Sequence, residues 1–312
     1  MASSPIDECI GVFRWVLDVQ SEWPCSDSIK SGREAATLWA LGKDNQRALN
    51  FLTAEEREKV LRFYHIRDVK LSLGSQLLKH CAVVKSCRVP WSESRISKHD
   101  NHKPCYVPKN GSGKHLEFNV SHHGSLVALA GCTDKDTQIG VDVVQVDTVK
   151  DVSKVRQEGW SSWVSTYAAV FSDREVQDIA IWKPSGSLDG DALLTAKLRH
   201  FYAHWCLKEA YVKMTGEALM APWLQDMEFR NVQAPRAASD LSVKDSKEDW
   251  GEAFSDVEVW RDGKQVTGVR LELQAFRDDY MIGTASSRLD APYSPYKLLD
   301  LQQDVYSAAE AN

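Results

Sequence analysis

Three short segments of this chain carry side chains suited to holding a magnesium-bound pyrophosphate. Together they offer an imidazole, two carboxylates and two lysines, which can serve phosphate oxygens and a hard divalent cation. Each segment alone is a weak signal, so their order and spacing carry the argument. The segments are Phe118–His123 (FNVSHH), Gly140–Val144 (GVDVV) and Trp205–Lys213 (WCLKEAYVK).

Asp142 lies in a segment that is predicted to be a β-strand. Side chains alternate between the two faces of a strand, so Asp142 shares its face with Gly140 and Val144. One carboxylate therefore emerges from an otherwise apolar strand, beside a glycine that leaves room. For this residue alone, the alternative is an aspartate at a strand end that leads into a turn.

Glu209 and Lys213 are four residues apart on a predicted helix and project from one side of it. They flank an apolar stripe at the edge of the expected core. For this pair alone, the alternative is a surface ion pair worth about 0.2–0.5 kcal/mol. Lys208 points away from the stripe, which predicts a solvated side chain. The stripe consists of Ala203, Cys206, Leu207, Ala210 and Met214.

His122 lies at the end of a predicted strand, where a single histidine is more often structural. The pair His122-His123 also resembles the H-H-x-x-x-D-G signature of acyl transfer, but Val127-Ala128 stand where that signature has Asp-Gly. A transition-metal site built on these histidines lacks further ligands at suitable spacing. Both of these functional alternatives are therefore disfavoured.

The composition narrows the class of protein. A chain of 312 residues with 43% hydrophobic content can form one large or two modest domains. Its net charge of −6 argues against a general nucleic-acid binder. Seven scattered cysteines without a C-x-x-C pair argue against a disulfide framework and against a zinc site. Without a long apolar run or a signal-peptide pattern, we expect a cytoplasmic protein with no membrane or nucleic-acid partner.

The first half of the chain is predicted to contain helices followed by an antiparallel strand meander. Thr53 and Glu56 form a capping box at one helix start. An apolar stripe predicts a longer helix over Asp68–Val84, and residues 92–115 are expected to be irregular. The three predicted strands are Leu116–Ser121, Leu126–Gly131 and Gln138–Val144.

The second half repeats this order, which indicates an α+β fold with two similar halves, although no strong internal sequence repeat is visible. Ser172–Glu175 is a second capping box. A helix is predicted over His200–Thr215 and should end at Gly216. Lys183–Asp191 reads as a surface insertion and residues 231–250 as a flexible excursion. The predicted strands are Val257–Trp260, Gln265–Gln274 and Tyr280–Ala285.

Combined, the segments resemble the Sfp-type 4'-phosphopantetheinyl transferases, and most closely the fungal and animal enzymes that serve large synthases. The resemblance runs from about Ala54 to Leu219, more than half of the chain. The pattern W-x-x-K-E-x-x-x-K after G-[IV]-D is highly specific in this order. The matching segments are Arg67–Lys70, Lys103-Pro104, Phe118–His122, Gly140–Val143, Phe171–Glu175 and Trp205–Gly216.

The resemblance implies a pseudo-two-fold pair of α+β subdomains, here residues 1–146 and 147–312, with coenzyme A and magnesium bound between them. It implies a monomeric holo-acyl-carrier-protein synthase. Such an enzyme transfers the phosphopantetheine arm of coenzyme A to a serine of an apo acyl or peptidyl carrier protein and releases adenosine 3',5'-bisphosphate. Carriers of fatty-acid, polyketide and nonribosomal-peptide synthases, and of the aminoadipate reductase of lysine biosynthesis, all remain open.

The same resemblance assigns roles to individual residues. Asp142 and Glu209 become ligands of Mg²⁺, with Mn²⁺ as an alternative ion. His122 contacts the coenzyme phosphates, Lys213 faces the pyrophosphate, and Glu209 or a bound water takes the serine proton. The catalytic set is therefore His122, Asp142, Glu209 and Lys213. The remaining coenzyme contacts are Lys59, Arg67, Lys70, Lys103, Ser121 and Lys208, together with His122 and Lys213.

Two positions depart from the bacterial members of the family. Val144 stands where they usually carry a second acid, although the animal type is also apolar there. Mg²⁺ usually keeps several waters, so a water in place of that carboxylate is reasonable. Glu56 stands where some bacterial relatives have a phosphate-contacting lysine, which leaves the 3'-phosphate contacts open.

Two alternatives to the transferase remain. One is a non-catalytic module that binds coenzyme A or a carrier protein; loss of Asp142, Glu209 or Lys213 would have favoured it, and all three are present. The other is a coenzyme-A-dependent acyltransferase, which would leave the pantetheine arm on the coenzyme.

Overall fold

The chain divides into two compact units, each of which is described by itself. In the computed structural model, the first unit comprises Met1–Ile139 and Ala291–Asn312 and the second Gly140–Asp290. The division therefore falls earlier than the expected boundary after residue 146, and the C-terminal segment returns to the first unit. The structure describes residues 11–23, 32–109, 111, 113–146, 148–217, 221, 223–241 and 249–311.

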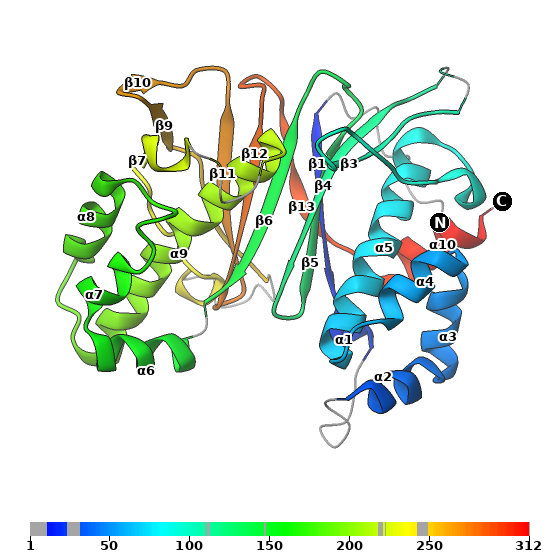
Figure 1. Cartoon of the computed structure of the whole chain (residues 1–312), viewed down its shortest axis with the longest axis horizontal. Helices are drawn as coiled ribbons and strands as arrows, with labels where there is room; N and C mark the ends of the chain where they lie inside the picture. Colours follow the sequence, from blue (N-terminus) through cyan, green and yellow to red (C-terminus); the bar gives the residue numbers. More distant parts are fainter. Residues whose placement is uncertain are drawn as a thin grey trace. The chain divides into compact units, whose positions relative to one another are not determined.

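The first unit is built on a six-stranded sheet with the order β13-β1-β5-β4-β3-β2 (Figure 1). Strand β1 pairs in parallel with β13 and antiparallel with β5. The expectation that residues 92–115 are wholly irregular is wrong, because β2 and β3 lie there. The strands are β1 (Val12–Asp18), β2 (Ser97–Lys98), β3 (Pro104–Tyr106), β4 (Leu116–His123), β5 (Leu126–Cys132) and β13 (Tyr293–Leu298).

The hairpin of β4 and β5 is confirmed. His123 pairs with Leu126, which leaves a two-residue turn in which Gly124 has a φ of +61°. A positive φ at this position suits glycine and the tight turns of hairpins. Strand β4 extends two residues beyond the predicted end at Ser121.

The third strand of the expected meander is real but lies in the other unit. Strand β6 (Ile139–Gln145) neighbours β12 in a second sheet and does not pair with β5. The alternating pattern of a strand fixes which side chains share a face, but it does not identify the neighbouring strand.

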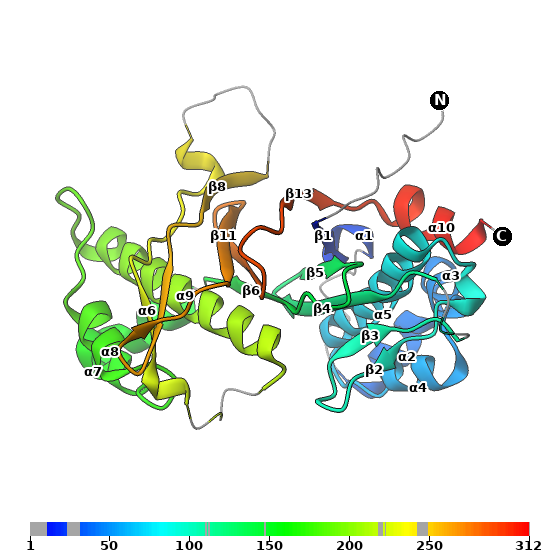
Figure 2. The same ribbon diagram turned by 90° about the horizontal axis from the view of Figure 1, so that it is seen from above.

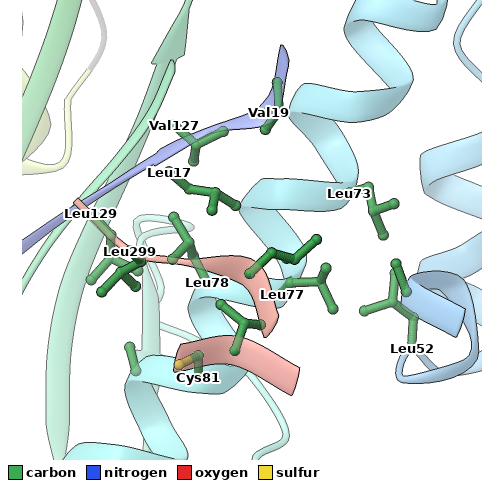
Figure 3. Packing of buried hydrophobic residues seen from close by; sticks show 14 of the residues in the cluster. Leu17, Val19, Leu52, Leu73, Leu77, Leu78, Cys81, Val127, Leu129 and Leu299 are labelled. Carbon is green, nitrogen blue, oxygen red and sulfur yellow. The ribbon is translucent and has the colours of Figure 1, made fainter. Parts of the chain in front are cut away.

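The helices of the first unit surround α5 (Ile66–Cys87), which contacts β4 and β5 and confirms the long helix predicted from the apolar stripe. Leu73, Leu77 and Leu78 of α5 are fully buried and form a core with residues of β1 and β5 (Figure 3). The other helical segments are α1 (Val19–Glu22), α2 (Arg33–Ala40), α3 (Lys43–Asn50), α4 (Ala54–Leu61), η1 (Trp91–Glu93), η4 (Leu301–Tyr306) and α10 (Ser307–Glu310).

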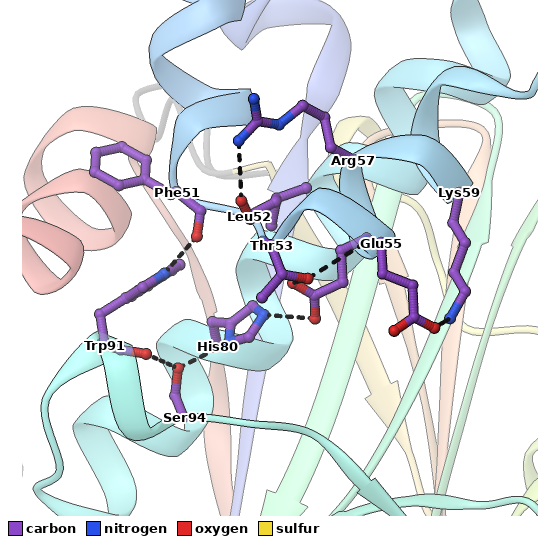
Figure 4. Close-up of polar contacts among 10 residues, drawn as sticks. Phe51, Leu52, Thr53, Glu55, Arg57, Lys59, His80, Trp91 and Ser94 are labelled. Carbon is purple, nitrogen blue, oxygen red and sulfur yellow. Dashed lines mark hydrogen bonds and ion pairs between the residues drawn. The ribbon is translucent and has the colours of Figure 1, made fainter.

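The predicted capping box at Thr53 is confirmed, and its glutamate, Glu56, has a second role. Figure 4 shows the surroundings of Thr53 and His80. The Glu56 carboxylate lies 3.0 Å from His80 Nε2, and this bond is the main cause that lowers the pKa of Glu56 to about 2. On its other side, His80 Nδ1 lies 2.7 Å from the hydroxyl of Ser94, which donates to the Trp91 carbonyl. Glu56 therefore ties α4 to α5, which accounts for an acid at this position.

The second unit contains two sheets, with the orders β6-β12-β11-β8 and β10-β9-β7. The strands predicted near its end are confirmed, except that the segment Gln265–Gln274 is divided between two strands. The strands are β7 (Met227–Arg230), β8 (Trp250–Phe254), β9 (Glu258–Arg261), β10 (Lys264–Gln265), β11 (Arg270–Phe276) and β12 (Tyr280–Ser286).

Helix α9 (Gly190–Thr215) contacts β12 and β11 and ends, as predicted, at Gly216, whose φ of 79° is left-handed (Figure 2). It begins ten residues before the expected start, so the last two residues of the predicted insertion Lys183–Asp191 belong to the helix. Of the expected excursion, residues 242–248 lie outside the described residues. The other helical segments are α6 (Thr148–Glu158), α7 (Trp160–Ser165), α8 (Asp173–Ile181), η2 (Leu224–Asp226) and η3 (Ala238–Asp240).

The α+β class predicted from the sequence is confirmed. In each unit a long helix contacts an antiparallel hairpin, α5 with β4 and β5 and α9 with β11 and β12. The similarity of the two halves remains a prediction. Among the described residues, no helix combines the length and the apolar character that crossing a membrane requires.

Candidate active site

Asp142 and Lys213 form an ion pair in the second unit. Lys213 Nζ, on the last turn of α9, donates to Asp142 Oδ1 on β6 across 2.5 Å. The Asp142 side chain is 7% exposed and that of Lys213 28%. The pair lies at the edge of the core, where charge interactions are stronger than on an open surface.

Gly140 allows helix α9 to lie close enough to β6 for this ion pair to form. A Cβ atom at Gly140 would lie only 2.0 Å from the carbonyl oxygen of Ala210 and 2.4 Å from the amide nitrogen of Met214. Glycine therefore lets the backbone of α9 approach β6 closely, and the strand alternation puts Asp142 on the same face. This confirms the sequence-based expectation that the glycine leaves room beside the carboxylate.

Glu209 lies one helical turn before Lys213 and is half-buried. Burial raises the pKa of Glu209 above its ordinary value, the charge of Asp142 raises it further, and Lys213 acts in the opposite direction. The two carboxylates are thus close enough to repel each other. Among the described residues, none forms a hydrogen bond or an ion pair with the Glu209 carboxylate.

Lys213 stays charged in this environment. Burial alone would lower its pKa, but Asp142, by its charge and its hydrogen bond, and Glu209 together raise that pKa above the ordinary value. With all three groups ionised, two carboxylates and one ammonium leave a net charge of −1.

The donor set fits a hard divalent cation. Carboxylate oxygens are ligands that Mg²⁺ prefers. Burial and, after it, repulsion from Asp142 raise the pKa of Glu209, and a cation would relieve that repulsion. Val144 is 2% exposed and belongs to the hydrophobic core of the second unit, so it contributes no oxygen. Asp142 and Glu209 are therefore the two carboxylates of this cluster that could hold a metal ion.

Lys208 contradicts the expectation of a solvated side chain. It is fully buried, and its ammonium donates to the Glu175 carboxylate at 2.5 Å and to the Met227 carbonyl at 3.0 Å. Glu175 is the glutamate of the predicted capping box on α8 and also accepts from the Phe229 amide. Lys208 thus joins α9 to α8 and β7, and this geometry does not support a direct contact with coenzyme A.

The other residues expected to contact the coenzyme belong to the first unit. On β4, Ser121 is buried and His122 is exposed. Lys70 and Lys103 are buried, and burial lowers the pKa of Lys103 while Glu117 acts against that shift.

Two further coenzyme candidates of the first unit are exposed and lie beside acidic neighbours. Lys59 forms an ion pair with Glu55 at 2.6 Å, and the Arg67 guanidinium lies 3.6 Å from the carboxylate of Asp68. Of the predicted site residues, the structure brings Asp142, Glu209 and Lys213 together in the second unit.

The described cysteines are buried and form no disulfide framework, since all five lie outside any disulfide bond. Burial raises the thiol pKa of Cys81, Cys105 and Cys206, which disfavours the nucleophilic thiolate at these positions. That pKa reaches about 12 for Cys81 and about 11 for Cys105, and for Cys206 it lies well above the usual range. Cys9 and Cys25 lie outside the described residues.

Comparison with known proteins bears directly on this arrangement. Residues 39–134 match the family model described as 4'-phosphopantetheinyl transferase, N-terminal, and residues 138–266 match that of the 4'-phosphopantetheinyl transferase superfamily. A 4'-phosphopantetheinyl transferase of Aureobasidium melanogenum is 33% identical over 96% of this chain and 98% of its own length. The chain belongs to the 4'-phosphopantetheinyl transferase family.

Other relatives of this phosphopantetheinyl transferase come from fungi and animals, as the resemblance in the sequence predicted. 4'-phosphopantetheinyl transferase 1 of Fusarium mangiferae is 38% identical over 88% of this chain and 86% of its own length. The human L-aminoadipate-semialdehyde dehydrogenase-phosphopantetheinyl transferase is 23% identical over 78% and 69%, respectively. The chain is thus a transferase of a family that uses coenzyme A as a substrate.

Proposed function

We propose that this phosphopantetheinyl transferase moves the 4'-phosphopantetheine arm of coenzyme A onto a serine hydroxyl of an apo acyl or peptidyl carrier protein. Holo carrier protein and adenosine 3',5'-bisphosphate are the products. The observation that carries the proposal is the cluster of Asp142, Glu209 and Lys213, in which a partly buried ion pair lies beside a second carboxylate with a raised pKa.

In this proposal Asp142 and Glu209 hold one magnesium ion, and manganese can replace it. When bound, the ion supplies positive charge that offsets the charge developing on the pyrophosphate. Waters complete its coordination where Val144 has no oxygen, since Mg²⁺ usually keeps several of them.

The chain's own residues supply the remaining chemistry. Lys213 keeps its proton, because its pKa is raised. Its ammonium stabilises the negative charge that develops on the departing phosphate of adenosine 3',5'-bisphosphate when the pyrophosphate bond breaks. Glu209, or a water that it orients, accepts the proton of the attacking serine. General-base help of this kind contributes about 10²–10⁴-fold to the rate.

The first unit supplies contacts to coenzyme A in this proposal. His122 contacts its phosphates from β4, and Ser121 and Lys103 are further coenzyme contacts. Arg67, Lys70 and Lys59 are the candidates for its 3'-phosphate end. We further propose that the enzyme acts as a monomer in the cytoplasm, without a nucleic-acid or membrane partner. The candidate carriers are those of fatty-acid, polyketide and nonribosomal-peptide synthases and of aminoadipate reductase, and the choice among them stays open.

Mass spectrometry of the carrier tests this function and separates it from its rivals. A panel of apo carrier proteins is incubated with the enzyme, coenzyme A and Mg²⁺. A mass gain of one phosphopantetheine unit on the carrier serine supports transfer. A gain of an acyl group alone, from an acyl-coenzyme A, would indicate an acyltransferase. An unchanged carrier mass despite coenzyme A binding would indicate a binding module.

A further inference from the structure

A second cluster of potential metal ligands lies in the first unit. His99 Nε2 is 2.8 and 2.9 Å from the two carboxylate oxygens of Glu117, and His115 Nε2 is 2.5 Å from Glu117 Oε1. The three candidate ligand atoms all lie within 4.8 Å of one another. Within the described part of the chain, no other group of three histidine, cysteine or acidic side chains meets this condition.

The sheet itself brings these side chains together. Ser97 of β2, Cys105 of β3 and Glu117 of β4 are direct cross-strand partners, so they form one row across three neighbouring strands (Figure 2). His115 is two residues before Glu117, and strand alternation therefore gives both the same face. His99 is likewise two residues after Ser97, and its amide donates to the Lys103 carbonyl, which continues the β2–β3 pairing.

We propose that His99, His115 and Glu117 bind one divalent transition-metal ion, with zinc as the best fit. Two imidazoles and one carboxylate form a common zinc donor set, in which the fourth position is left to water. Bond lengths of about 2.0–2.2 Å in a tetrahedral site would separate neighbouring ligand atoms by roughly 3.3 Å. The observed contacts are shorter by about half an ångström or more, so the site needs to open only slightly.

The exposure of the three side chains leaves room for that fourth ligand. Glu117 is 7% exposed, His115 21% and His99 40%, so the cluster opens toward solvent on the side of His99. Glu117 Oε1 faces both imidazoles, and without a metal these nitrogens can only share it as hydrogen-bond donors. A metal would take the place of the protons between the nitrogens and the carboxylate.

Metal binding would hold the β2–β3 hairpin against strand β4. Lys103 lies on the connection that follows His99 and leads into β3, and its ammonium interacts electrostatically with Glu117. A metal shared by His99, His115 and Glu117 would fasten this β2–β3 hairpin to β4. The site lies in the first unit and uses none of the three residues Asp142, Glu209 and Lys213, so it is independent of the proposed transfer chemistry.

A zinc titration of the full-length, chelator-treated protein tests this site. Excess Mg²⁺ is present to occupy the oxygen ligands of the second unit, and a coloured chelator competes for zinc. We expect one zinc ion per chain, bound at least about tenfold more weakly by His99→Ala and His115→Ala. His102→Ala is the matched control, because His102 is an exposed histidine of the same hairpin outside the cluster. Its affinity should equal that of the parent.

Glu117→Gln separates the loss of a metal ligand from the loss of folding, because the glutamine side chain has the same size and can still accept a hydrogen bond. It should keep the melting temperature of the metal-free protein but lose the zinc affinity. Cobalt(II) in place of zinc should give visible absorption bands in the parent and in His102→Ala only. Absence of zinc binding by the parent, equal affinity in all variants, or zinc loss on Cys105→Ser instead would overturn the proposal.

Discussion

Lys213 reaches from the last turn of α9 to Asp142 in the middle of β6 and donates a hydrogen bond across 2.5 Å. This contact depends on Gly140, which admits the helix backbone next to the strand. In the absence of a cation, Lys213 is thus a counter-charge for Asp142. The pKa of Glu209, by contrast, is raised by burial and by the charge of Asp142. The two carboxylates therefore differ, because Asp142 has an ammonium partner and Glu209 has a raised pKa.

The first prediction concerns the two carboxylates. Asp142→Ala and Glu209→Ala should each reduce carrier modification by at least about 100-fold at saturating Mg²⁺, because each removes one of two protein ligands. The rate is measured by mass spectrometry of an apo carrier, and folding by circular dichroism. Glu217→Ala removes an exposed carboxylate just beyond the end of α9 and serves as the control. Near-normal turnover of either site variant would exclude the metal assignment.

The second prediction separates Lys213 from the metal ligands. Lys213→Met frees Asp142 from its internal counter-charge, so Mg²⁺ should bind several-fold more tightly, by on the order of 1 kcal/mol. Transfer should nevertheless fall by at least about 100-fold, because the pyrophosphate loses a cation. Calorimetric titration with Mg²⁺ and the carrier assay are run in parallel, with the exposed Lys183→Met as the control. Weaker Mg²⁺ binding would mean that Lys213 helps to build the metal site.

The third prediction uses the raised pKa of Glu209. A carboxyl whose folded-state pKa lies above its unfolded value of 4.5 destabilises the fold at neutral pH and has no effect below that value. Glu209→Gln should therefore raise the melting temperature at pH 7.5 in EDTA by up to about 4 °C, and this difference should vanish below pH 4.5. Saturating Mg²⁺ should stabilise the parent protein and not the variant.

The pH dependence of the reaction gives an independent check on the same group. If Glu209 is the base, transfer should decline as the pH falls through its folded pKa. In Lys213→Met that decline should move to higher pH, because Lys213 lowers the pKa of Glu209 in the parent. Equal stability of Glu209→Gln and the parent in EDTA, at every pH, would show that the charged Glu209 carboxylate does not destabilise the fold.

Local patterns predicted much of the second unit's site. The period of two around Asp142, the spacing of four between Glu209 and Lys213, and the C-terminal Gly216 are local features, and each is found in the structure. Strand β1 was missed for a physical reason. All seven residues of β1 are buried, so it lacks the alternation that marks a half-exposed strand. The partner of β6 depends on long-range pairing, which alternation does not encode.

Lys208 shows where a helical stripe misleads. The sequence placed it on a solvated face of its helix, but α9 is buried on more than one side. Phe201, His204 and Tyr211 of the same helix are buried as well. A buried lysine requires a partner for its charge, and here that partner is Glu175. Glu175 is about thirty residues away in sequence, and the sequence pattern indicated only its role in the capping box.

The fourth prediction follows from that buried pair. Lys208→Met leaves the Glu175 carboxylate, which is 2% exposed, without its ammonium and should destabilise the fold by about 3–5 kcal/mol. The double variant with Glu175→Gln should recover part of this loss. Urea denaturation measures both, and the coenzyme A affinity of the remaining folded protein should be unchanged. A stable Lys208→Met protein with weakened coenzyme A binding would restore Lys208 to the list of coenzyme contacts.

The last prediction distinguishes two neighbouring histidines. His122 and His123 are adjacent on β4, so their side chains leave opposite faces of the strand and cannot easily reach one phosphate. The family pattern assigns His122 to the coenzyme phosphates, and His123 directly precedes the Gly124-Ser125 turn. His122→Ala should therefore weaken coenzyme A binding by about 1.5–3 kcal/mol, as expected for a hydrogen bond to a charged group.

His123→Ala is the matched control for this prediction, because both histidines are exposed and both are paired with β5. Its effect on coenzyme A affinity should be much smaller than that of His122→Ala. Calorimetric titration of both variants decides the matter at a pH near 6, where a protonated imidazole binds phosphate more strongly. Equal losses, or a larger loss at His123, would mean that the other face of β4 serves the coenzyme.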